Sequence, residues 1–151
     1  MEKLHFPAFG FRFKDKENKR YIWDIARRRY VRLTPEEWVR QHVIHFLSGV
    51  KKYPLPLMGV EKKLTVNGMS RRTDLVVFDR RMKPQIIVEC KAPGVAVSQK
   101  VFDQIARYNM ALHARYLMLT NGRQHYFCRM DFEEETYVFL PDIPDYQKEK
   151  S

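Results

Sequence analysis

Apolar residues recur with the period of a helix in some segments of this chain and with the period of a strand in others, and each period predicts the corresponding element. A helix is predicted over residues 35–47, with Thr34 as its N-cap, Glu37 as the capping-box acid and Ser48-Gly49 as its end. A second helix is predicted from a Ser98 cap to about His113.

Runs rich in β-branched and aromatic residues, bounded by turn residues, predict the strands. Asn67-Gly68 is a strong hairpin-turn signal between the first two of them. The expected strands are Val60–Val66, Arg72–Phe78, Gln85–Lys91, Arg115–Thr120 and Gln124–Met130.

The two ends of the chain have their own patterns. Phe11–Phe13 and Tyr21–Ile25 predict an N-terminal β-hairpin around the polar stretch 14–20, and the basic stretch 27–32 predicts a strand or a loop. From Asp131 on, acidic residues and prolines predict a loose tail, although 137–140 could add an edge strand.

The order of helix, three antiparallel strands, helix and strand defines an αβββαβ core. A crossover helix favours a parallel neighbour, so we expect an α/β (α+β) fold with a mixed central sheet flanked by helices. A chain of 151 residues suits a single domain. We divide it into an extension (1–33), a core (34–130) and an acidic tail (131–151).

Composition narrows the class of protein. A hydrophobic content of 44% supports a packed globule. No apolar run reaches the length of a membrane span and the first residues lack a signal-peptide pattern, so we expect a cytoplasmic protein. Cys90 and Cys128 are expected to be free, buried thiols.

The net charge of +10 is unevenly distributed. Residues 1–100 hold 22 of the 28 Lys and Arg and 10 of the 18 Asp and Glu, which gives this part a net charge of +12. A basic surface of this kind suits a polyanion, most commonly a phosphate backbone. A well-solvated basic surface without a partner is the alternative.

Candidate chemistry lies on two of the predicted strands. Side chains alternate along a strand, so Glu89 and Lys91 should project from one face and Cys90 from the other. If the two strands pair in register, Asp74 lies beside Glu89. Two carboxylates this close repel unless a cation lies between them, which predicts a hard divalent metal, Mg²⁺ or Mn²⁺. The alternatives are a solvated strand end at Asp74 and a structural ion pair between Glu89 and Lys91.

This set resembles the PD-(D/E)xK nuclease superfamily. Thr73 replaces the motif's proline, and Gln104 to Tyr108 resembles the QxxxY motif of its RecB-like members. The stretch Val88–Pro93 followed by Thr120-Asn121-Gly122 is similar to the N-terminal nuclease domain of type I restriction enzyme R subunits. This resemblance runs from about Pro35 to Phe127.

The resemblance implies a Mg²⁺-dependent DNA endonuclease. Asp74, Glu89 and the Cys90 carbonyl would hold the metal, with an acid of the first helix, where Glu37 is the best candidate and Glu36 the next. Lys91 would assist the attacking water or neutralise charge on the phosphate.

Other site residues have ordinary alternatives. Glu37 has a complete role as a capping residue. Gln104 would orient Lys91 or contact DNA, or is a plain polar position on its helix. Tyr108 is a candidate DNA contact, but a tyrosine at this helical spacing is often a core residue.

The arginines near the site strands suit backbone contacts. Arg71, Arg72, Arg80 and Arg81 could grip DNA without reading its sequence, so we expect low intrinsic specificity. The resemblance implies targeting by partner subunits, and because the chain has no phosphate-binding loop, any ATP-driven motor would be a separate chain. A non-catalytic nucleic-acid-binding or assembly module with the same fold remains the alternative.

Overall fold

The computed structural model describes residues 1–147 and has a mixed six-stranded sheet at its centre. The order across the sheet is β11-β10-β9-β8-β7-β4, and every neighbouring pair is antiparallel except β8 and β9. Its strands are β4 (Met58–Val60), β7 (Leu75–Phe78), β8 (Pro84–Cys90), β9 (Tyr116–Thr120), β10 (His125–Asp131) and β11 (Thr136–Leu140). The predicted mixed sheet and α+β class are confirmed.

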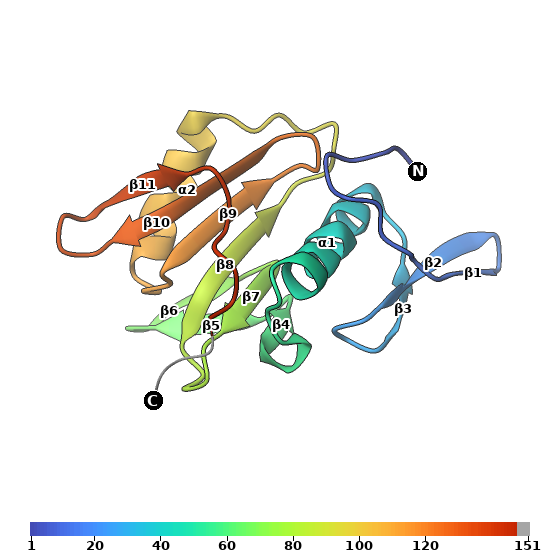
Figure 1. The fold of residues 1–151 in the computed structure, drawn as a ribbon, viewed down its shortest axis with the longest axis horizontal. Helices are drawn as coiled ribbons and strands as arrows, with labels where there is room; N and C mark the ends of the chain where they lie inside the picture. Colours follow the sequence, from blue (N-terminus) through green and yellow to red (C-terminus); the bar gives the residue numbers. More distant parts are fainter. Residues whose placement is uncertain (148–151) are drawn as a thin grey trace.

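Helix α1 (Pro35–His45) covers one face of this sheet and helix α2 (Gln99–Met110) covers the other (Figure 1). Thr34 and Ser98 cap them as predicted, since each side chain accepts a hydrogen bond from the third residue beyond it. The second helix ends three residues earlier than expected. Neither helix, within residues 1–147, is long and apolar enough to cross a membrane.

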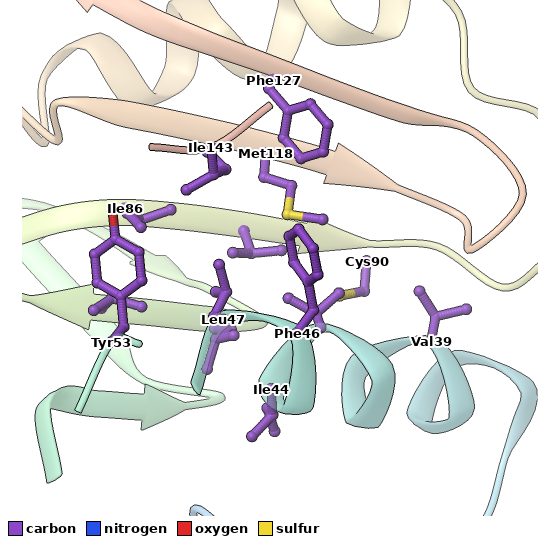
Figure 2. Packing of buried hydrophobic residues seen from close by; sticks show 14 of the residues in the cluster. Val39, Ile44, Phe46, Leu47, Tyr53, Ile86, Cys90, Met118, Phe127 and Ile143 are labelled. Atoms are coloured by element: carbon purple, nitrogen blue, oxygen red, sulfur yellow. The ribbon is translucent and has the colours of Figure 1, made fainter. Parts of the chain in front are cut away.

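The α1 face holds the larger core. Val39, Val43 and Leu47 are fully buried with Val77 and Val88 of the sheet. Figure 2 shows Phe46 pointing from the helical segment toward Met118.

The helical segment does not end at Ser48-Gly49. A π-helical turn, Phe46–Val50, continues it past the predicted stop. Phe46 and Leu47 lie in this turn and are buried in the core on the α1 side. The helical structure therefore includes Ser48 and Gly49, where the helix was expected to end.

The expected strand Val60–Val66 is divided in the structure. Met58–Val60 joins the central sheet as β4, whereas β5 (Lys63–Val66) pairs with β6 (Met69–Arg72) in a separate two-stranded sheet. Asn67-Gly68 forms the turn of that hairpin as predicted, both residues having positive φ. Arg72 therefore ends β6 and does not begin the site strand.

The N-terminal extension forms a three-stranded sheet in place of a two-stranded hairpin. Its strands are β1 (Phe13–Lys16), β2 (Lys19–Asp24) and β3 (Arg29–Arg32). The polar stretch expected as a loop is mostly strand, because Glu17-Asn18, with φ of 52° and 60°, makes a tight two-residue turn. The basic stretch 27–32 contributes a strand, as one of its two interpretations had it.

The predicted loose tail is wrong for the residues that can be described. Strand β11 forms the edge of the central sheet, as the alternative interpretation proposed. Ile143 beyond it is fully buried in the α1-side core, so the core continues past residue 130. The last four residues of the tail lie outside the described residues.

Candidate active site

Asp74 and Glu89 lie side by side where β7 begins and β8 ends. Leu75 pairs with Val88, so the same register continued by one residue places Asp74 opposite Glu89. Asp74 Oδ2 accepts a hydrogen bond of 2.7 Å from the backbone N–H of Cys90. The backbone carbonyl of Asp74 accepts a second hydrogen bond, of 3.0 Å, from the N–H of Glu61. Both the side chain and the backbone of Asp74 are therefore held by hydrogen bonds.

Glu89 is a buried carboxylate with one arginine partner. Only 7% of the residue is exposed, and its Oε1 accepts a hydrogen bond from Arg71 Nη2. Burial raises the pKa of Glu89 to about 7; the Arg71 guanidinium opposes this rise and the neighbouring charge of Asp74 adds to it. Strong perturbation by burial and a specific charge is typical of functional carboxylates, although ion-pair networks produce it too.

Adjacent residues of β8 project to opposite faces of the sheet, as predicted. Cys90 packs in the cluster on the α1 side, whereas Glu89 reaches Arg71, whose guanidinium lies 4.3 Å from the ring centroid of Tyr108 in α2. Burial raises the pKa of the Cys90 thiol well above its ordinary value, and Cys90 and Cys128 are both free. The Cys90 side chain therefore belongs to the core.

Lys91 follows β8 directly. Its backbone N–H donates a 2.8 Å hydrogen bond to the carbonyl of Thr120, which extends the β8–β9 pairing by one residue. Its side chain makes no ion pair within 4 Å among residues 1–147. Its positive charge opposes the rise in pKa that burial causes at Glu36 and Glu89.

The Thr120-Asn121-Gly122 turn supports the segment that carries Lys91. Asn121 Nδ2 donates to the carbonyl of Val95, and its Oδ1 accepts from the N–H groups of Arg123 and Gln124. Gly122 has a φ of 85°, and a Cβ there would lie 2.8 Å from Leu4. This part of the motif thus has a structural explanation.

A buried arginine of α1 joins the carboxylates. Arg40 Nη2 lies 3.3 Å from both Glu36 Oε1 and Asp74 Oδ1. Partial burial, and then the charge of Asp74, raise the pKa of Glu36. Glu36 is therefore the acid of the first helix that lies beside Asp74.

Glu37, the acid preferred from the sequence, points elsewhere. Its Oε1 accepts hydrogen bonds from Arg40 Nη1 at 2.7 Å and Arg27 Nη2 at 2.8 Å, and its Oε2 accepts one from Gln41. The same network reaches the fully buried Asp24. Glu37 holds this ionic network, whereas Glu36 shares Arg40 with Asp74; which of the two acids would serve a metal stays a prediction.

Sequence reasoning missed Arg40 and Glu61. Arg40 stands four residues after Glu36 and three after Glu37, a spacing that signals ion pairs on one helix face. Glu61 lies between β4 and β5 and pairs with Arg27, Arg40 and Arg72. No local signal identifies it, because its partners come from distant segments.

The predicted DNA-gripping arginines do not form one group. Arg71 and Arg72 lie on β6 near the carboxylates, but Arg80 and Arg81 lie in the turn after β7, at the opposite end of the site strands. Arg80 there lines a different hollow of about 480 Å³, together with Tyr53 and Tyr116. Arg80 and Arg81 thus do not flank the carboxylates.

The two predicted residues of α2 are both exposed to solvent. Tyr108 is 47% exposed and reaches the site through Arg71, so it is not a core residue. Gln104 lies one turn earlier on the same helix and makes no side-chain hydrogen bond within residues 1–147. Its role in orienting Lys91 stays a prediction.

A mixed sheet with an acid before one strand, and E-x-K at the end of the next, is consistent with the PD-(D/E)xK nuclease superfamily. A family model described as the type I restriction enzyme R protein N terminus matches residues 35–144, and the chain belongs to that family. The match includes β11, but it leaves out the N-terminal sheet β1–β3. No curated protein matches the chain.

Proposed function

We propose that this domain is a divalent-metal-dependent DNA endonuclease with low intrinsic sequence specificity. The observation that carries the proposal is the pairing of Asp74 and Glu89 at adjacent strand ends, with Lys91 next along the chain. The family supports a restriction-related role, a DNA substrate and the context of a restriction complex.

The donor set fits a hard cation chemically. Two carboxylates and the Cys90 backbone carbonyl are oxygen donors of the kind that Mg²⁺ and Mn²⁺ prefer. Within residues 1–147 no three Asp, Glu, His or Cys side chains converge closely enough to hold a metal ion. Arg71 and Arg40 carry the positive charge at the two carboxylates, so Arg71 would have to release Glu89 for both to bind metal. When bound, the metal would lower the pKa of a water and polarise the scissile phosphate.

The chain's own residues then have distinct roles. Lys91, whose amino group makes no ion pair within the described residues, would help to deprotonate the attacking water or neutralise charge on the phosphate. Arg71, once released, would contact the phosphate backbone while remaining beside Tyr108. Asp74 keeps its orientation through the Cys90 N–H.

Nicking of supercoiled plasmid with Mg²⁺ or Mn²⁺ tests the proposal. Wild type should convert plasmid to open circles only with metal, while Asp74→Asn, Glu89→Gln and Lys91→Ala should each lose activity. Arg129→Gln, on the exposed side of β10, is the control and should cut like wild type. Metal-dependent cutting that survives in Glu89→Gln would refute the assignment.

A non-catalytic nucleic-acid-binding or assembly module is the second candidate. The observation in its favour is that Glu89 and Asp74 already have arginine partners, the pattern of a structural ionic network. It predicts DNA binding without cleavage at any metal concentration. It also predicts that Glu89→Gln costs stability and leaves DNA affinity unchanged.

A further inference from the structure

The N-terminal sheet β1–β3 lies next to α1, on the side away from β9 to β11 (Figure 1). One face of this sheet packs inward: Ile22 is fully buried, and the ring of Phe13 lies 6.2 Å from that of Trp38 in α1. Side chains alternate along strands, so the intervening positions form an outer face.

The outer face is basic and aromatic. Between β1 and β2, Lys14 lies opposite Tyr21 and Lys16 lies opposite Lys19. Between β2 and β3, Tyr21 lies opposite Arg32 and Trp23 lies opposite Tyr30. The backbone N–H of Trp23 donates a hydrogen bond to the carbonyl of Arg12, which continues the β1–β2 pairing to Arg12. Directly opposite residues share a face. Within β1–β3 this face has no acidic side chain, because Asp15 and Asp24 belong to the inner positions.

Two aromatic rings of this face are in contact with cationic side chains of the same sheet. The Arg12 guanidinium lies 4.8 Å from the Trp23 ring centroid, and Lys14 Nζ lies 5.4 Å from that of Tyr30. The Trp23 and Tyr30 rings lie edge to face with centroids 5.1 Å apart. Each ring can exchange its cation for a stacked base, and the released cation can then pair with a phosphate.

The outer face continues into the site. Tyr30 and Arg32 line a hollow of about 500 Å³ together with Glu36 and Arg40. Arg40 in turn lies 3.3 Å from Asp74. A nucleic-acid strand bound across β3 would therefore pass through this hollow to the paired carboxylates.

We propose that the outer face of β1–β3 binds an unpaired nucleic-acid strand and guides it toward the Asp74–Glu89 site. Bases stack on Trp23 and Tyr30, and the phosphates contact Arg12, Lys14 and Arg32. This inference rests on the proposed function, since it takes nucleic acid as the partner.

The aromatic rings favour an unpaired nucleic-acid strand over a duplex. Stacking on a side chain requires an exposed base face, which only an unpaired nucleotide offers. A surface that gripped duplex DNA through phosphates alone would need the basic residues and not Trp23 or Tyr30. The two kinds of residue can therefore be tested separately.

The test measures binding by fluorescence anisotropy in EDTA, so that cleavage does not interfere. The probes are a labelled single-stranded DNA oligonucleotide and a blunt duplex of the same sequence. Trp23→Leu with Tyr30→Leu removes both rings but keeps apolar bulk. Phe139→Leu, which removes a 41% exposed ring on β11, is the matched control. Unfolding curves check that every variant is folded.

We expect the double leucine variant to bind the single strand at least tenfold more weakly than wild type, with less than a twofold change for the duplex. Lys14→Gln with Arg32→Gln should weaken binding of both probes and reduce the salt dependence. Arg115→Gln with Arg129→Gln, which removes the same charge elsewhere, should not. Equal single-strand binding by wild type and the leucine variant would overturn the proposal, and so would equal losses for both probes.

Plasmid nicking and single-strand binding can fail independently of each other. A wild type that nicks plasmid, with a leucine variant that binds strands normally, refutes only the role of β1–β3. A wild type that never nicks plasmid, with strand binding that depends on Trp23 and Tyr30, refutes only the nuclease.

Discussion

The side chain of Asp74 accepts a 2.7 Å hydrogen bond from the backbone N–H of Cys90, joining the start of β7 to the last residue of β8. This bond fixes one carboxylate oxygen and turns the other toward Arg40, 3.3 Å away. Glu89, next to Cys90, faces the other arginine, Arg71. The paired acids are thus held between two guanidinium groups.

Metal binding should depend on the paired carboxylates. Asp74→Asn with Glu89→Gln removes two negative charges without changing side-chain size, and we expect Mn²⁺ binding in titration calorimetry to be abolished. Glu134→Gln with Glu135→Gln removes the same number of carboxylates from exposed positions and should bind Mn²⁺ like wild type. Unchanged affinity in the first variant would remove Asp74 and Glu89 as ligands.

Arg71 should compete with the metal for Glu89. Its guanidinium occupies Glu89 Oε1, so Arg71→Gln should raise the affinity for Mn²⁺ about fivefold at pH 8 and low salt, the effect of one nearby charge screened by a polar environment. Arg72→Gln is the matched control, because the adjacent Arg72 pairs with Glu61 instead. A loss of Mn²⁺ affinity in Arg71→Gln would show that Arg71 supports the site rather than blocks it.

Glu36 and Glu37 should differ in what they contribute. Glu36→Gln changes a half-exposed side chain beside Asp74, so we expect slower plasmid nicking with little change in urea unfolding. Glu37→Gln removes the buried carboxylate that Arg27 and Arg40 share, although Arg27 keeps Asp24, and should lower the free energy of unfolding by about 2–4 kcal/mol. The reverse pattern would restore Glu37 as the site acid.

Much of the fold could be predicted because its signals are local. Caps at Thr34 and Ser98, the Asn67-Gly68 turn and the alternation in β8 each depend on a few neighbouring residues. Pairing of Asp74 with Glu89 also followed, since a short turn fixes the register of adjacent strands.

What could not be predicted depends on distant residues. Glu36 and Glu37 are adjacent in sequence, and only the positions of Arg27 and Asp74 decide which one faces the site. The division of Val60–Val66 likewise follows from pairing of β4 with β7, not from its own residues. In the N-terminal sheet the hairpin was predicted, but its turn residues with positive φ, Glu17-Asn18, lack the glycine that would have placed a tight turn inside the stretch 14–20.

Stability should fall in mild acid because of buried and partly buried histidines. Burial lowers the pKa of His42, His45 and His125 below 6.5, so the unfolded chain binds more protons as the pH falls through that value. Glu89 acts in the opposite sense, since its pKa of about 7 lies above the ordinary 4.5 and its contribution is lost as the pH rises.

Comparing the pH dependence of unfolding in wild type and His42→Gln measures the contribution of His42. From pH 8 to pH 5.5, His42→Gln should lose less free energy of unfolding than wild type in urea titrations, because a glutamine does not gain a proton on unfolding. His113→Gln, at an exposed position, should follow wild type. Parallel curves for wild type and His42→Gln would show that His42 does not contribute to the pH dependence.

Lys91 should act on the chemical step. Its amino group has no ion-pair partner within 4 Å in residues 1–147, and Lys91 directly follows β8, whose end carries Glu89, so it would be free to act on a phosphate bound there. Lys91→Ala should cut the rate of plasmid nicking about a hundredfold or more, the usual scale for losing one acid–base or charge-stabilising group. DNA affinity in EDTA should fall far less, because one phosphate contact is a small part of the electrostatic total. Lys63→Ala, which removes an exposed lysine from β5, should nick plasmid like wild type. If Lys91→Ala also cuts at the wild-type rate, Lys91 is only a surface charge and the catalytic set must be assigned again.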